Sequence, residues 1–330
     1  MADFLTRVGR MRFLWCAVLL AGCGPEGFQY GVGGQGPGHR NQQVALSAQQ
    51  EVTLGDEAFQ EVLSKEKQIP GEEGAHLKAH VQEVGDKIFR AALTNVPLQH
   101  EINLSETDPY GTPWNFNDRA YAVLDNPEVN AFCLPGGKVV VLKGLLDLTA
   151  NNEDWLATVL GHEIAHAVAH HASERIAREQ MYGPASSAAT GSEATTGLDR
   201  AKSEKWKLLD LLGVGLHARR YADEPPQQSE QPGGIFGQLS ELKFDRLQEE
   251  EADHIGVFLM AFADDRYDPK HAIDFWQAME EQSNGKQPPE ILSDHPSDQH
   301  RISMMRRWAV SATDARNAWR AGRIDPSAAH

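Results

Sequence analysis

The chain of 330 residues contains only three cysteines, too few for a disulfide framework. It has no apolar run long enough to predict a protein that crosses a membrane several times. Basic residues are also scarce, because 31 Lys and Arg stand against 47 Asp and Glu, a net charge of -16. A chain this acidic is repelled by phosphate groups, so general nucleic-acid binding is not expected. Its hydrophobic fraction of 41% supplies a core and excludes a wholly disordered chain.

Residues 1–22 have the pattern of an export signal. Three arginines precede the apolar run Phe13 to Ala21, which is too short for a comfortable transmembrane helix. The segment that follows, Leu20 to Cys23, resembles a bacterial lipoprotein cleavage box, which predicts cleavage before Cys23 and lipidation of that residue. The alternative is an ordinary secretory signal with a chance cysteine. Residues 23–43 are predicted to be a flexible, glycine-rich tether.

Residues 44–325 are predicted to form one domain of the α+β class, mostly helical. Amphipathic helices are expected from Ser47, with a capping box to Gln50, to about Ser64, and from about Glu73 to Ala92. Short β-rich runs follow at 120–124 and 138–142, and helical patterns return after residue 150. A small sheet within a mostly helical domain is therefore expected.

Residues 181–243 are predicted to be a partly mobile insertion. Its stretches 183–197 and 224–237 are rich in Ser, Ala, Thr, Gly, Pro and Gln, and a short amphipathic helix is predicted between them, at 206–214. Two roles for this insertion remain open: a lid over an active site, or a loop of no catalytic consequence.

The strongest chemical signal is the sequence His162-Glu163-Ile164-Ala165-His166. A helix is predicted here, since Asn151 can cap it and apolar residues recur along one stripe. Residues i and i+4 lie one above the other on a helix, so the two imidazoles can bind one ion. Imidazoles with a carboxylate suit zinc, and the spacing alone leaves other transition metals open. Glu163 lies about 100° further round and can reach water at that ion without ligating it. Two structural histidines beside a solvated glutamate are the alternative.

A zinc ion needs a third protein ligand. Alanine occupies positions 169 and 172, where the metzincin pattern has glycine and histidine, and this excludes that class. The other common solution is a carboxylate from a later helix, and Glu249 and Asp253 share one face of such a helix. One can ligate the ion while the other accepts a hydrogen bond from a ligand histidine. Glu250 and Glu251 are predicted to be solvated charges at the start of that helix.

Several motifs in chain order resemble metallopeptidase family M48, which includes the HtpX proteases, the CAAX prenyl endopeptidases and the BepA and LoiP proteins. The matching segments are Leu46–Gly55, Asn130–Phe132, Leu134–Gly137, Gly144–Leu146, His162–His166, Glu249–Asp253, Ser293–Pro296 and Arg301–Ile302. The family usually has a serine before the arginine that begins the third-ligand helix, and this chain has Asp245 there. The insertion between His166 and Glu249 is also long. Because the chain also ends too soon for a tetratricopeptide domain, a short, lipid-anchored form is expected.

The resemblance implies a gluzincin-type domain with a small β-sheet beside the metal-binding helix. It implies one zinc ion per chain, held by His162, His166 and Glu249. Glu163 is then expected to take a proton from the attacking water and to deliver it to the leaving amine. Asp253 is expected to orient a ligand histidine.

Further roles are carried over from the same family. His295 is expected to be a displaceable fourth ligand that closes the resting site, with an ordinary loop histidine as the alternative. Arg301 is expected to stabilise the oxyanion, with simple pairing to acidic neighbours as the alternative. Asn130, Ala131 and Phe132 are predicted to lie on a strand that aligns an extended peptide, unless the stretch is a plain core hairpin.

The sequence therefore predicts a zinc endopeptidase that cleaves unfolded or misassembled envelope proteins in quality control. A chaperone-like assembly factor with a gated, mostly inactive zinc site is the alternative. The expected location is the periplasm, lipid-anchored, with the outer membrane favoured because Gly24 replaces the Asp associated with inner-membrane retention.

Overall fold

The computed structural model describes residues 40–182, 246–283 and 291–323, apart from positions 41, 96, 97, 100, 101, 105, 109, 151, 293, 294 and 296–298. The export signal, Cys23, most of the predicted tether and nearly all of the predicted insertion lie outside these residues. None of the helices within the described ranges has the length and apolar character needed to cross a membrane.

Helices make up most of the described chain, as expected. The elements in chain order are α1 (Ala48–Lys65), α2 (Gly71–Thr94), β1 (Ala120–Leu124), β2 (Ala131–Leu134), β3 (Lys138–Leu142), α4 (Lys143–Thr149), α5 (Glu153–Val168), α6 (His171–Tyr182), α9 (Arg246–Ala263), α10 (His271–Ser283) and α12 (Gln299–Arg320).

The predicted start of α1 is confirmed. The Ser47 side chain accepts a hydrogen bond from the Gln50 N–H, and the Gln50 side chain accepts one from the Ser47 N–H, which completes the capping box. The predicted cap of α5 is wrong by one residue. Asn152, not Asn151, accepts a hydrogen bond from the Trp155 N–H, because the helix begins at Glu153.

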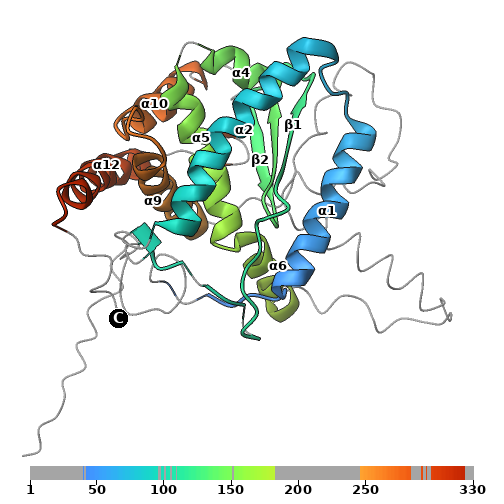
Figure 1. Ribbon diagram of the computed structural model, residues 1–330, viewed down its shortest axis with the longest axis horizontal. Coiled ribbons are helices and arrows are strands. Elements are labelled where there is room, and N and C mark those ends of the chain that lie inside the picture. The colour runs from blue at the N-terminus through green and yellow to red at the C-terminus, as the bar shows by residue number, and fades with distance from the viewer. Residues whose placement is uncertain are drawn as a thin grey trace, which may run out of the picture.

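The three strands form a mixed sheet in the order β1-β3-β2, with β1 parallel and β2 antiparallel to β3. Figure 1 shows α1 on one side of this sheet and α2 and α5 on the other. Side chains alternate between the two sides, as the strand geometry requires. Val140 and Leu142 pack in the cluster with Leu54 and Phe59 of α1, whereas neighbouring strand residues join the larger core that contains α2, α5 and α9. The sheet is therefore buried on both faces and lies beside the α5 helix.

Helices α5 and α9 approach each other closely at a pair of glycines. A Cβ built on Gly161 would lie 2.9 Å from the Gly256 carbonyl oxygen, closer than real Cβ contacts come. Only glycine permits this backbone contact. It fixes the separation of the two helices directly beside His162.

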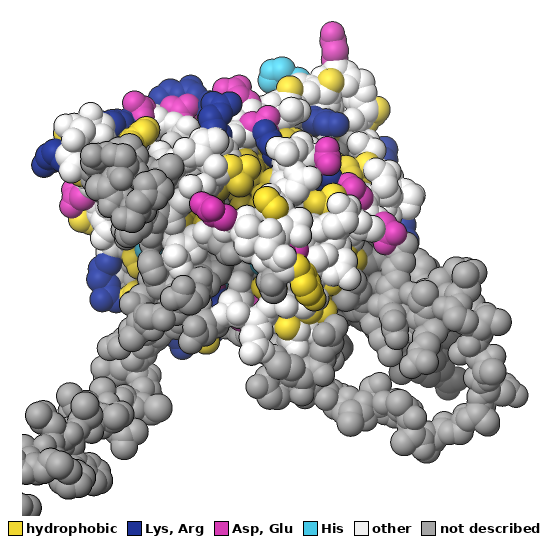
Figure 2. Space-filling view, turned by 60° about the horizontal axis from the view of Figure 1, so that its bottom comes forward, with side chains coloured by type: hydrophobic (Ala, Val, Ile, Leu, Met, Phe, Trp, Pro, Cys, Tyr) yellow, Lys and Arg dark blue, Asp and Glu magenta, His cyan; other side chains and the backbone are white. Residues whose placement is uncertain are grey.

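Surface charge of both signs is mixed on the face drawn in Figure 2, where Lys and Arg side chains stand among acidic ones. The described atoms of this face show no concentration of basic side chains.

Candidate metal centre

Helix α5 delivers two imidazoles and one carboxylate to the interior. His162, Glu163 and His166 are each at most 3% exposed. The helix is apolar around its circumference, so it is buried on all sides rather than along one stripe. A side chain as polar as histidine is stable in such a place only when it is paired or bound to an ion.

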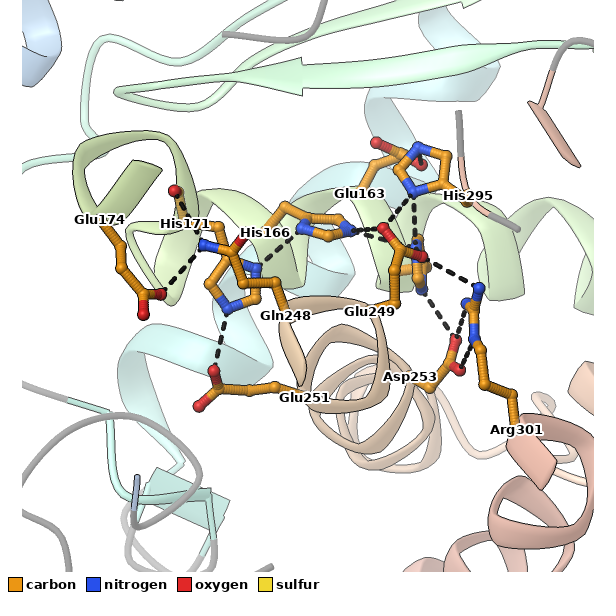
Figure 3. A network of polar contacts seen from close by, with 11 residues as sticks. Glu163, His166, His171, Glu174, Gln248, Glu249, Glu251, Asp253, His295 and Arg301 are labelled. Atoms are coloured by element: carbon orange, nitrogen blue, oxygen red, sulfur yellow. Dashed lines mark hydrogen bonds and ion pairs between the residues drawn. The ribbon is translucent and has the colours of Figure 1, made fainter. Parts of the chain in front are cut away.

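Four buried residues, His162, His166, Glu249 and His295, each offer one ligand atom, and these atoms all lie within 4.8 Å of one another. The Nε2 atoms of His162 and His166 are 3.1 Å apart. The His295 Nδ1 atom lies 3.2 Å from the His162 Nε2 atom and 2.9 Å from the Glu249 Oε1 atom. The Glu249 carboxylate oxygens lie 3.4 and 3.5 Å from the Nε2 atoms of His162 and His166. Figure 3 shows the labelled members converging on one point between α5 and α9.

These separations match the requirements of a zinc ion. Donors about 2.0–2.1 Å from a tetrahedral ion are roughly 3.3 Å apart, which lies within the observed range. Imidazole nitrogens and a carboxylate are also the donor types that zinc prefers. Because two imidazole lone pairs facing each other repel without a cation between them, the cluster fits one zinc ion.

Burial and charge prepare two of these ligands for an ion. Burial disfavours the charged form of Glu249, but the positive charges of His295 and Arg301 outweigh it and hold the pKa of the Glu249 carboxyl well below its usual value. Burial lowers the pKa of His166 well below its usual value, which favours the neutral imidazole. The deprotonated carboxylate and the neutral imidazole are the forms that bind a metal.

Glu163 lies at the edge of the cluster. Its Oε1 atom is 3.4 Å from the His295 Nε2 atom, so the carboxylate adjoins the ligand set without belonging to it. This is the place that the sequence predicted for a general base. His295 occupies the fourth position of the cluster.

Asp253 and Arg301 support the ligands from behind. The Asp253 Oδ1 atom lies 3.0 Å from the His162 Nδ1 atom, which directs the His162 Nε2 atom toward the cluster. Arg301 donates two hydrogen bonds to Asp253, at 2.7 and 2.9 Å, and its Nη1 atom lies 3.1 Å from Glu249. This buried pairing favours the alternative reading of Arg301, in which it neutralises the carboxylates, over the role in stabilising an oxyanion.

The prediction that Glu250 and Glu251 are solvated is wrong, because they are 1% and 0% exposed. Glu251 accepts a hydrogen bond from His171, and the His171 Nδ1 atom lies 2.8 Å from the His166 Nδ1 atom. His171 and Glu251 therefore form a second support for a predicted ligand, which sequence reasoning missed. Local spacing did not signal this pair, because residues two positions apart on a helix, such as Glu249 and Glu251, do not share a face.

The predicted substrate strand lies at the edge of the sheet. Ala131 and Phe132 belong to β2, which pairs with β3 on one side and packs in the region of α5. Asn130 precedes the strand, and its side chain accepts a hydrogen bond from the Ala131 N–H. The edge position is what β-augmentation by a peptide requires. Cys23, the predicted lipidation site, is not among the described residues.

A buried His-His-Glu-His set beside a glutamate, on two packed helices next to a small sheet, defines a metal-dependent peptidase. The model of the family described as Peptidase family M48 matches residues 78–309. The chain belongs to peptidase family M48 and is a metalloendopeptidase with a zinc-type site. The sequence-based expectations of this family, of a mostly helical fold and of one zinc ion are confirmed.

Several characterised proteins resemble the chain. The mitochondrial metalloendopeptidase OMA1 of Saccharomyces cerevisiae is 27% identical over 284 residues, which cover 83% of this chain and 68% of that protein. The metalloendopeptidase OMA1 of Bos taurus is 35% identical over 202 residues, which cover 59% of this chain and 33% of that protein. The Beta-barrel assembly-enhancing protease of Escherichia coli is 28% identical over 231 residues, which cover 66% of this chain and 40% of that protein. The chain spans less than half the length of the last two relatives.

Proposed function

We propose that the chain cleaves unfolded or misassembled proteins in the bacterial cell envelope, as a quality-control endopeptidase anchored through a lipid on Cys23. The observation that carries the proposal is the buried cluster of His162, His166 and Glu249 with Glu163 at its edge. Two relatives whose names describe a protease of β-barrel assembly support the envelope setting. The lipoprotein pattern of residues 1–23 supports the periplasmic, outer-membrane location.

The catalytic roles follow from the positions of the side chains. Zinc, when bound, supplies a Lewis acid that activates water and polarises the scissile carbonyl. Glu163 takes the proton of the attacking water and delivers it to the leaving nitrogen. Asp253 holds His162 in the tautomer that presents its Nε2 atom, and Arg301 holds Asp253 and Glu249 in place. β2 aligns the substrate as an added strand, which selects extended chains rather than one sequence.

The position of His295 supports a second candidate function. Its Nδ1 atom contacts both His162 and Glu249, so it fills the place that water or a substrate carbonyl would take. A protein with this position permanently filled would hold substrates without cleaving them, as a chaperone-like factor. The intact Glu163 favours the peptidase, with His295 as a ligand that substrate displaces.

The deciding experiment compares the full chain with its Glu163→Gln form. We expect one zinc per chain in both, measured by elemental analysis, and cleavage of unfolded casein by the wild type alone. Zinc without cleavage in either form would favour the chaperone-like alternative, and His295→Ala would then be expected to release activity. Equal cleavage by both forms would contradict the role of Glu163.

The anchor is tested separately. Labelled fatty acid should be incorporated into the wild type expressed in a bacterial host and not into Cys23→Ser. The Cys23→Ser protein should also be absent from the membrane fraction. Lipidation of the variant would contradict the assignment of Cys23.

A further inference from the structure

The N-terminal arm, which we define as Arg40 with residues 42–46, is docked against the α5–α6 turn. The Arg40 side chain is 10% exposed, although it falls in the segment that the sequence predicted to be a flexible tether. The Gln42 side chain donates to the carbonyl of Ala169, and the Leu46 N–H donates to the Ser173 hydroxyl at 2.8 Å. The arm therefore packs on the protein from its first described residue.

Arg40 joins two buried carboxylates that come from different helices. Its guanidinium donates to Glu174 of α6 at 2.7 Å and to Glu251 of α9 at 2.6 and 2.8 Å. Gln248 donates to the same Glu174 carboxylate at 3.0 Å. Two buried carboxylates this close to one cation would repel each other in its absence.

A continuous chain of hydrogen bonds runs from Arg40 to the metal ligand His166, and Figure 3 shows it from Glu251 onward. His166 presents its Nε2 atom to the cluster, so its Nδ1 atom carries the proton and donates to the His171 Nδ1 atom, 2.8 Å away. His171 then carries its own proton on Nε2 and donates to Glu251 at 3.0 Å. The two bonds from His166 through His171 point toward Glu251, and Arg40 donates from the other side to the same Glu251 oxygen that accepts from His171.

The backbone is strained where it places His171. His170 has a φ of 56°, in the left-handed region that residues other than glycine rarely adopt. Its ring is held by a 2.9 Å contact with Glu51 and by stacking on Trp114, with ring centroids 3.5 Å apart. This turn brings His171 back beside His166, only five residues earlier in the chain. The strain is consistent with a specific position for His171 rather than with a passive loop.

We propose that Arg40 is a positioning residue of the metal centre, which acts through Glu251 and His171 on His166. The docking of the N-terminal arm and the binding of zinc then reinforce each other. His162 needs no such chain, because Asp253 supports it directly. The inference rests on the proposed function only in taking the buried cluster as the zinc site.

The test measures zinc affinity rather than peptidase activity. The full chain is compared with Arg40→Gln, Glu251→Gln and the double variant, by competition with a chromophoric chelator. We expect each single variant to bind zinc about 10- to 100-fold more weakly, as is usual for the loss of a support behind a ligand. The double variant should bind no more weakly than the weaker single variant, since both changes break one chain. The visible spectrum of the cobalt-substituted protein should change in both single variants.

Arg119→Gln is the matched control, because Arg119 pairs with Asp86 at 2.7 Å and neither residue belongs to the chain to His166. Its zinc affinity and cobalt spectrum should equal those of the wild type. Arg40→Lys keeps the positive charge and should recover part of the affinity. If Arg40→Gln does not fold, Arg40→Lys and Glu251→Gln carry the same comparison.

The result that would overturn the proposal is a set of folded Arg40 and Glu251 variants with wild-type zinc affinity and cobalt spectrum, even if their melting temperatures fall. Additive losses in the double variant would also overturn it. A wild type that binds no zinc would instead overturn the proposed function. In hydrogen exchange, zinc should slow the amide of Leu46 in the wild type and not in Arg40→Gln.

Discussion

Replacing Gly161 by alanine should weaken the metal site by forcing apart the two helices that carry it. The added Cβ would lie 2.9 Å from the Gly256 carbonyl oxygen, whereas ordinary contact begins at 3.4 Å. The helices must therefore separate locally by about 0.5 Å. His162 follows Gly161 directly, and Glu249 lies on the opposing helix, so the same displacement acts on the ligand set.

The size of the effect follows from how little the distances between a zinc ion and its ligands can change. Distances to ligands vary by about 0.2 Å in good sites, less than the imposed shift. Overpacking of this kind costs about 1–3 kcal/mol. The metal-free chain can relax part of that strain, and the zinc-bound chain less. Each 1.4 kcal/mol is tenfold, so we expect zinc affinity to fall about 10- to 100-fold.

The assay is zinc titration against a competing chelator, together with thermal unfolding of the metal-free chain. Ile255→Val is the control, because it removes one methyl from a fully buried side chain on α9 and costs about 0.5–1.5 kcal/mol without pushing on α5. It should lower stability and leave zinc affinity unchanged. A Gly161→Ala chain that melts at a lower temperature but binds zinc as tightly as the wild type would refute the reasoning.

Three further outcomes are expected. Asp253→Ala should weaken zinc binding about 10- to 100-fold, because it frees the His162 ring and removes one of the two carboxylates that pair with Arg301; an unchanged affinity would contradict this. Burial raises the pKa of Glu174, but the hydrogen bond and charge of Arg40 lower it by more. The net result is a pKa of about 2 in the folded chain, against 4.5 in the unfolded chain. The pair thus stabilises the fold fully above about pH 4.5, and on the order of 3 kcal/mol should be lost as the pH falls toward 2. Urea unfolding from pH 6 to pH 3 should lose less stability in Arg40→Gln, and equal losses would count against the pair. Finally, zinc at 1,000 times its Kd should add about 4 kcal/mol, so a chelator should lower the melting temperature by roughly 10 °C, and no shift would argue against a bound ion.

Much of the fold and the ligand set could be predicted because the signals are local. The His162–His166 spacing needs one helical turn, and Ser47 with Gln50 needs three residues of context. The strands at 120–124 and 138–142 follow from runs of β-branched and apolar residues. The choice of Glu249 as third ligand came from the resemblance to a family, since the spacing alone allowed either Glu249 or Asp253 to ligate the ion.

The rest depends on partners that are far apart in the chain. Glu251 looked like a solvated charge because a helix start favours acidic residues, and only folding brings Arg40 and His171, 211 and 80 positions away, against it. Arg40 likewise looked like part of a tether, because the glycines around it carry no apolar period. The sequence left Arg301 open between an oxyanion and a carboxylate, and only folding brings Asp253, 48 positions away, against its guanidinium.

The ligands His166, Glu249 and His295 come from stretches of chain that are separated by more than 80 and more than 40 residues. An ion held by all of them is a reversible cross-link that closes two long loops, and it restricts the unfolded chain in the way a disulfide does. The chain has only three cysteines with which to make a covalent tie. Zinc would therefore keep the two halves on either side of residues 183–245 associated even after a cut within that segment. Without the ion, a molecule cut in this way would be held together by the packing of α9 against α2 and α5, so it should come apart at a lower temperature than the zinc-bound form.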